Sequence, residues 1–110
     1  MLNTVTLTGS YEDGAANQPS GWLQFVPSAA LTDADDLVLL RQEPVNVPLA
    51  SGAFSVSLIA TDNAGLQPPG WYWTVTEYLA GLPPSAPWNF YLAFSDGATQ
   101  DISSLSPAVI

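Results

Sequence analysis

The sequence predicts an all-β protein, an antiparallel Greek-key β-sandwich of about seven to eight short strands, immunoglobulin-like or prealbumin-like. Segments in which apolar and polar residues alternate recur about every dozen residues. Ten prolines and eight glycines interrupt the chain, and no segment has the length and composition of a stable helix. A chain of 110 residues is long enough to bury one core without disulfides, and it contains no cysteine.

Residues 50–79 hold the greatest apolar bulk and are expected to centre the core. Both halves of this segment alternate large apolar side chains with others at a period of two, as strands do. The apolar set is Phe54, Val56, Leu58, Trp71, Trp73 and Val75. Between the halves, residues 62–65 and 68–70 are typical turn residues, because glycine and asparagine tolerate positive φ and proline cannot donate to a ladder.

Two strands are expected before this segment, near the N-terminus. Residues 4–8 alternate threonine with valine and leucine, and residues 21–26 place leucine and phenylalanine on one face. The polar segment between them, residues 10–21, is long for a hairpin loop. We therefore expect it to be ordered by Tyr11 or by a contact outside the domain.

The middle of the chain holds three short segments. Residues 28–36 are too few for a stable helix and are expected to form a turn or a single helical loop. Residues 37–42 are apolar on both faces, which predicts a strand covered on both sides. Residues 45–49 alternate around Pro48, which predicts an edge strand because proline has no N–H to donate to a ladder.

The C-terminal part begins with a proline-rich loop, residues 79–87. Residues 88–94 alternate aromatic and aliphatic side chains with others, and residues 99–103 follow a turn signal, so each segment predicts a strand. The sandwich is thus expected to span residues 1–103. Residues 104–110 are an apolar tail, expected to dock on this domain or on a neighbour.

Charge and composition exclude several classes of function. Ten acidic residues against one base, Arg41, give a formal net charge of −9, which disfavours nucleic acid and anionic membrane surfaces as partners. Without cysteine or histidine the chain has no thiolate or imidazole chemistry. Its long uncharged runs are interrupted by proline, so no membrane insertion is expected. The low charge density elsewhere indicates that neighbours cover part of the surface.

Four motifs follow one another along nearly the whole chain. They are Gly9-x-Tyr11-x-Asp13-Gly14, Gly21-x-Leu23-x-Phe25-x-Pro27-Ser28, Ser51-Gly52-x-Phe54-x-Val56-x-Leu58 and Pro69-Gly70-Trp71-x-Trp73-x-Val75-x-Glu77. This order resembles the small β-sandwich domains of minor tail and tail-fibre proteins of actinobacterial phages. Those domains are similar to prealbumin-like, carboxypeptidase-regulatory and invasin-type sandwiches.

The resemblance implies a non-enzymatic structural protein of the virion, assembled in the host cytoplasm into a phage tail. Its implied partners are other tail proteins, its own subunits as a trimer, and a host cell-wall glycan, with no cofactor. The resemblance also implies that residues 101–107 lead out of the domain towards a fibre, a neighbouring module or a subunit contact.

The acidic residues suggest sites that we weigh against simple solvation. Asp33, Asp35 and Asp36 have the oxygen ligands that Ca²⁺ takes, but their spacing lacks the glycine and the distal glutamate of an EF-hand loop. A solvated loop is the ordinary interpretation, as it is for residues 12–13. Glu43 and Glu77 flank strands and form no glycosidase motif, so we expect neither an enzyme nor a metal site.

Four aromatic residues are the candidate contact residues: Trp22, Tyr72, Tyr78 and Trp88. Exposed rings stack on sugar faces or anchor protein interfaces, whereas the ordinary alternative is that the tryptophans fill the core. A flat row of rings would favour glycan adhesion, and rings that meet Pro84 and Pro87 around a symmetry axis would favour a subunit contact. The alternative function is therefore a carbohydrate-binding module of a cell-wall enzyme. No residue supports a third hypothesis, an inhibitor or toxin.

Overall fold

The computed structural model describes residues 2–12, 15, 17–33, 38–105 and 107, which form an all-β architecture. In these ranges ten strands form three mostly antiparallel sheets, and the only helices are two short 3-10 turns. The elements are β1 (Thr4–Ser10), β2 (Gly21–Pro27), β3 (Leu31–Asp33), β4 (Val38–Leu40), β5 (Val45–Pro48), β6 (Ala53–Ile59), β7 (Leu66–Gln67), β8 (Trp73–Leu79), β9 (Trp88–Phe90), η1 (Phe94–Asp96), β10 (Thr99–Asp101) and η2 (Ile102–Ser104). Neither helix within the described ranges has the length and apolar character needed to cross a membrane.

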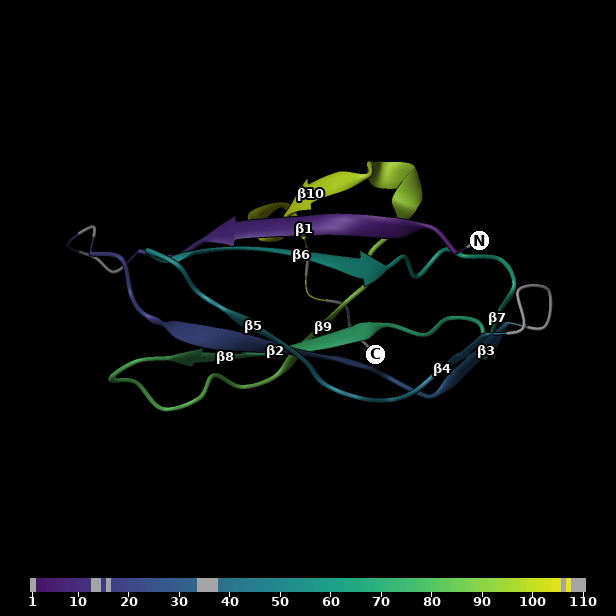
Figure 1. Ribbon diagram of the computed structural model, residues 1–110, viewed down its shortest axis with the longest axis horizontal. Coiled ribbons are helices and arrows are strands. Elements are labelled where there is room, and N and C mark those ends of the chain that lie inside the picture. Colours follow the sequence, from purple (N-terminus) through teal and green to yellow (C-terminus); the bar gives the residue numbers. More distant parts are fainter. Residues whose placement is uncertain (1, 13–14, 16, 34–37, 106, 108–110) are drawn as a thin grey trace.

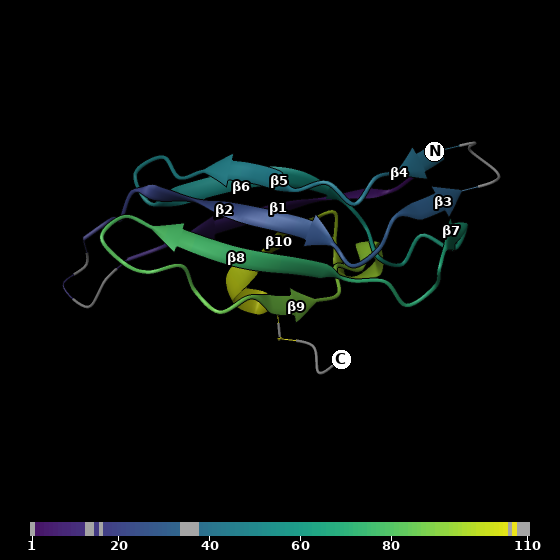
Figure 2. The ribbon, with the colours of Figure 1, turned by 90° about the horizontal axis from the view of Figure 1, so that it is seen from below.

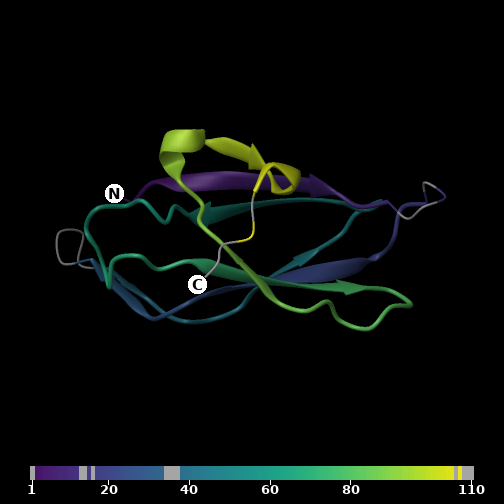
Figure 3. The ribbon, with the colours of Figure 1, turned by 180° about the vertical axis from the view of Figure 1, so that it is seen from behind.

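The two larger sheets lie in two layers, and the third sheet extends from one end of the molecule (Figure 1). One layer has the strand order β10-β1-β6, and the other has the order β5-β2-β8-β9. The small sheet β4-β3-β7 contributes to an elongated shape of 48 × 25 × 24 Å. Seen from behind, the chain leaves β9 in one layer and rises to η1 and β10 in the other (Figure 3).

The apolar residues expected from segment 50–79 do form the centre of the core. All six pack there; Val56 is half-buried, and the other five are buried. Burial of each such large side chain stabilises the fold by roughly 1.5–3 kcal/mol. The two halves of the segment do not pair with each other: β6 pairs with β1 in one layer, and β8 pairs with β2 in the other.

One hydrogen bond links the two layers at this centre. The indole N–H of Trp73, on β8, donates to the carbonyl oxygen of Ile59, on β6, over 2.9 Å. The bond is partly buried, and it satisfies the indole N–H of Trp73, a side chain that is itself buried.

Three expectations for short segments need correction. Residues 28–36 include β3, a strand rather than a turn, because residues 31–33 find ladder partners in β4 and β7. The strand expected at residues 37–42 exists as β4, but it is not covered on both sides, since Leu39 is 64% exposed. The strand expected at residues 88–94 ends at Phe90, and 3-10 geometry begins at Phe94.

The edge position of β5 is confirmed, and the pairing of β10 differs from expectation. β5 is the outermost strand of its sheet. The Leu49 N–H donates to the Gly21 carbonyl, so the ladder alternation turns the nitrogen of Pro48 away from β2. β10 pairs with β1 in parallel, not antiparallel, because the chain returns to this layer from β9. Leu105 packs against the core, while residues 106 and 108–110 of the expected tail lie outside the described residues.

Candidate functional site

The outer face of the sheet β5-β2-β8-β9 carries the candidate site. In Figure 2 this sheet lies in front of the other layer, with its four strands side by side. Successive side chains of a strand point to opposite faces, so the positions between the buried core residues of these strands face outward. We call this set the aromatic–amide face: Trp22, Gln24, Val26, Asn46, Pro48, Tyr72, Thr74, Thr76, Tyr78, Asn89 and Tyr91.

The strand register arranges this face in rows. At one end Pro48, Trp22 and Tyr78 lie side by side on β5, β2 and β8. The next row contains only amide and hydroxyl side chains, those of Asn46, Gln24 and Thr76. A third row follows on β2, β8 and β9, composed of Val26, Thr74 and Asn89.

A stacked ring pair forms the first row. The ring centroids of Trp22 and Tyr78 are 4.1 Å apart, and their planes are 8° from parallel. Each ring therefore hides one face against the other, yet the Trp22 side chain remains 37% exposed. Pro48 is the partner of Trp22 on the other neighbouring strand, β5.

A second aromatic pair lies at the opposite end of the face. Tyr72, just before β8, and Tyr91, just after β9, meet edge to face with centroids 6.3 Å apart and an interplanar angle of 78°. Tyr91 is 49% exposed. Six residue steps separate Tyr72 from Tyr78, which corresponds to about 20 Å at about 3.3 Å per residue.

The polar side chains between the two pairs retain hydrogen-bonding capacity. The Thr74 hydroxyl donates to the Asn89 side-chain oxygen over 2.8 Å. The two N–H donors of the Asn89 side-chain amide are not used in this bond. Within the described part of the chain, no hydrogen bond involves the side chains of Gln24, Asn46 or Thr76. The middle of the face thus offers both donors and acceptors.

The face is uncharged, although the chain carries a net charge of −9. The one carboxylate of β8, Glu77, lies opposite the buried Leu23 and close to Tyr11. Burial of the Tyr11 phenol, and then its hydrogen bond and charge repulsion with Glu77, raise the pKa of Tyr11 well above its ordinary value. The carboxylate is thereby held away from the outer surface.

The structure brings three of the four aromatic candidates to this face. Trp22 and Tyr78 lie together, and Tyr72 lies at the far end. Trp88 instead packs against the core, with its ring centroid 5.4 Å from that of Phe90. Sequence reasoning missed Tyr91, whose place opposite the buried Phe90 in the strand alternation is the signal that indicates it.

Two amide residues of the face, Gln24 and Asn46, were also not predicted from the sequence. They become neighbours through the register of β2 with β5, which no local pattern reveals. Pro84 and Pro87, which exposed rings would meet if this surface formed a subunit contact, are both exposed in the loop that follows β8.

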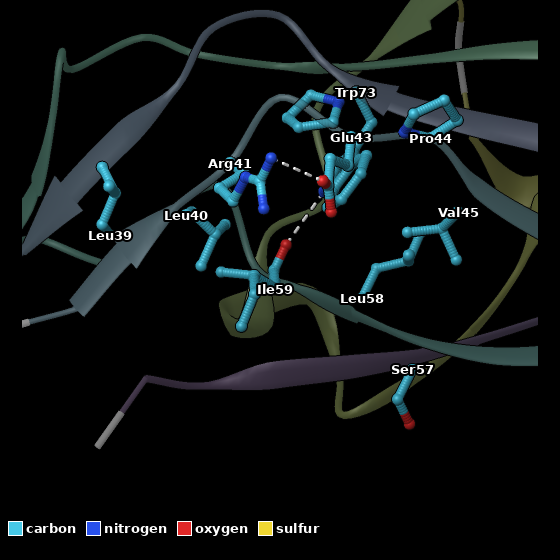
Figure 4. Close-up of a pocket in the computed structure, with 11 residues that line it drawn as sticks. Leu39, Leu40, Arg41, Glu43, Pro44, Val45, Ser57, Leu58, Ile59 and Trp73 are labelled. Carbon is cyan, nitrogen blue, oxygen red and sulfur yellow. Dashed lines mark hydrogen bonds and ion pairs between the residues drawn. The ribbon is translucent and has the colours of Figure 1, made fainter.

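A pocket of about 370 Å³ is the second candidate (Figure 4). It opens between β6 and the segment that joins β4 to β5, and its walls are mainly apolar. Its charged groups, Arg41 and Glu43, are exposed and pair with each other over 3.0 Å. Because its two charged side chains already pair with each other and its walls are mainly apolar, the pocket has less to offer a polar ligand than the aromatic–amide face.

The acidic candidates do not assemble into a site among the described residues. No three potential metal ligands come together there, and Asp13, Asp35 and Asp36 lie outside the described ranges. Asp33 is buried beside Gly65, so it does not extend into a solvated loop. Glu43 and Glu77 have separate neighbours, Arg41 and Tyr11.

No model of a known protein family matches this chain, and a search among curated proteins finds no match either.

Proposed function

We propose that this chain is a non-enzymatic attachment domain that binds a neutral polysaccharide on its aromatic–amide face. The observation that carries the proposal is an uncharged outer sheet face with an aromatic pair at each end and amides between them. Sugar rings present apolar C–H faces that stack on aromatic rings, and their hydroxyls exchange hydrogen bonds with amides and hydroxyls.

Charge and size both suit such a ligand. An acidic chain repels anionic polymers, whereas a neutral glycan is not repelled and finds no unpaired charge on this face. A separation of about 20 Å between the two aromatic pairs accommodates several linked sugar units along the direction of β8. An extended ligand would therefore contact both pairs at once.

The setting that we propose is a phage tail or tail fibre, with other tail proteins and further copies of the chain as partners. Support comes from the four sequence motifs, which resemble tail domains, and from the two facing layers, which suit a β-sandwich. We assign that sandwich to the Greek-key, prealbumin-like type. A carbohydrate-binding module of a cell-wall enzyme is the alternative, and the same aromatic–amide face favours it.

Calorimetric titration with neutral cell-wall polysaccharide tests glycan binding. We expect saturable heat, together with a change in tryptophan fluorescence because Trp22 lies at the contact. The variants Trp22→Ala and Tyr91→Ala should each weaken binding, since stacking on one ring contributes about 0.5–1.5 kcal/mol. Leu39→Ala, which removes an exposed side chain from the small sheet, is the control and should bind like the wild type.

If the wild type gives neither heat nor a fluorescence change at saturating polysaccharide, glycan binding is wrong. A purely structural role in the tail would then be the remaining form of the proposal. Binding that survives both aromatic substitutions would place the glycan at another surface.

A further inference from the structure

Strand β6 forms an open edge of its sheet. It is the outermost strand of the layer β10-β1-β6, and it runs for seven residues, Ala53–Ile59. Its sequence, AFSVSLI, contains no charged residue and no proline. Long, uncharged edge strands are templates for pairing with another strand, and proteins ordinarily protect them.

The ladder with β1 shows which backbone groups of β6 point outward. The Ala60 N–H donates to Asn3, and the Tyr11 N–H donates to Gly52, so the even-numbered residues from 52 to 60 face β1. The N–H and C=O groups of Ser55 and Ser57 therefore point away from the sheet. No hydrogen bond among the described residues uses these four groups.

The other edges among the described strands are protected. β5 carries Pro48, whose nitrogen faces outward, and Pro44 precedes the strand. β9 and β10 have three residues each, and the edge strands of the small sheet are no longer than that. Short strands and prolines are common devices against edge pairing. β6 has neither.

A pocket lies beside one end of this edge. Residues 57–59 of β6 line the apolar pocket, and Ser57 lies apart from the cluster of other lining residues in Figure 4. Ser55 and Ser57 are both exposed. A strand approaching β6 would thus meet open backbone groups, with the pocket next to them.

We propose that β6 pairs with β6 of a second copy of this chain, antiparallel across a twofold axis between the two Val56 residues. In this register, Ser55 of each copy lies opposite Ser57 of the other. The four open groups of each copy are then all satisfied in two closely spaced hydrogen-bonded pairs. The two sheets merge into one, ordered β10-β1-β6-β6-β1-β10.

The open groups of Ser55 and Ser57 are symmetric about Val56, which suits a second copy of the same strand, and the lack of charge on β6 permits this contact. A symmetric contact brings each residue close to its own equivalent, so any carboxylate near the axis would face another carboxylate. The chain has a net charge of −9, but the seven residues of β6 include no charged side chain. This repulsion therefore does not arise along the strand. An isologous contact closes at two copies, whereas the tail-protein resemblance implies three. The inference is independent of glycan binding, because the aromatic–amide face belongs to the other sheet.

Sedimentation equilibrium over a concentration series tests the pairing. We expect the full chain to approach twice its monomer mass and to associate more strongly at high salt, which screens the repulsion between the two acidic copies. Ser57→Pro should weaken association about tenfold or more, because it removes two of the four intermolecular hydrogen bonds. Ser57→Ala keeps the N–H and should associate like the wild type.

Fold integrity and register are tested separately. Ser57→Pro leaves the ladder with β1 intact, so its near-ultraviolet circular dichroism should match that of the wild type. Under mild oxidation, Val56→Cys should give a covalent dimer, since directly opposed residues of this kind of pair lie about 4.5 Å apart between Cα atoms. Val45→Cys is the control. Val45 is a half-buried valine on β5, an edge strand of the other layer, and this variant should not give a covalent dimer.

A wild type that remains monomeric throughout the series would overturn the proposal. So would a trimer, or a dimer that Ser57→Pro leaves unchanged, because either result requires a different contact.

Discussion

Trp22 and Tyr78 stand face to face on adjacent strands, with ring centroids 4.1 Å apart and planes 8° from parallel. They are cross-strand partners in the β2–β8 ladder, so the strand register holds the rings together. The pair contributes both to the stability of the sheet and to the surface that we propose for glycan stacking. These two roles can be separated by experiment.

The stacked pair should couple the two residues energetically. In a double-mutant cycle with Trp22→Ala and Tyr78→Ala, we expect an interaction free energy of about 0.5–1.5 kcal/mol, as for other aromatic pairs. Urea unfolding of the four proteins measures it. The same cycle with Trp22→Ala and Tyr91→Ala should give a value near zero, because these rings lie at opposite ends of the face. Coupling of equal size in both cycles would contradict this interpretation.

The two ends of the face should contribute independently to glycan binding. We expect the losses in binding free energy caused by Trp22→Ala and Tyr91→Ala to add within about 0.5 kcal/mol, since well-separated sites without shared partners are additive. Calorimetry on the single and double variants measures this sum. Short oligosaccharides that reach one end only should respond to one substitution and not to the other.

Two buried tryptophans should differ in the cost of losing the indole N–H. Trp71 and Trp73 are each 3% exposed, but the Trp73 N–H donates to Ile59, whereas that of Trp71 finds no acceptor among the described residues. Trp73→Phe leaves the Ile59 carbonyl without its donor and should destabilise the fold by about 1–3 kcal/mol more than Trp71→Phe. Chemical denaturation of both variants tests the difference. Equal losses in the free energy of unfolding would show that the hydrogen bond between Trp73 and Ile59 does not stabilise the fold.

Gly9 should tolerate no side chain. A Cβ atom there would overlap the ring of Phe54 on β6 and lie 2.7 Å from a methyl group of Ile102. We expect Gly9→Ala to destabilise the fold by about 1–3 kcal/mol, the usual cost of overpacking. Ser10→Ala, at the exposed next position, is the matched control and should change the unfolding free energy little. A stable Gly9→Ala variant would show that Phe54 and Ile102 can move apart.

Asp62 should make stability depend on pH in the acid range. Its slight desolvation acts in the opposite direction, but the backbone N–H groups of Phe94 and Ser95, at 2.8 and 3.1 Å, lower the pKa of its carboxyl. Because the folded pKa is below the unfolded value of about 3.9, this stabilisation is fully present above that value and is lost as pH falls through the folded pKa.

Urea midpoints measured as pH falls from about 6 to about 2 test this dependence. The difference between wild type and Asp62→Ala should shrink as the acid range is entered. Asp96→Ala is the control, because within the described residues the Asp96 carboxylate accepts no hydrogen bond. A constant difference between wild type and Asp62→Ala would rule out the charge-assisted bonds to η1.

Sequence reasoning identified the contents of the core but not how its strands pair. Alternation with a period of two places Trp71, Trp73 and Val75 on one face whatever the partner strand, so their burial could be predicted. It does not say that β8 joins β2 while β6 joins β1, because pairing depends on contacts between distant segments. β3 was missed for the same reason: three residues have little strand propensity of their own, and residues 66–67 complete their ladder.

The sequence by itself determined that the chain forms strands, which residues their apolar faces bury, and that Pro48 belongs at an edge, because alternation and the missing proline N–H are local properties. Only the tertiary structure decided that Trp22 meets Tyr78, that Trp88 turns inward and that β6 is left open. Those outcomes follow from register and sheet order, which the packing of the whole chain selects.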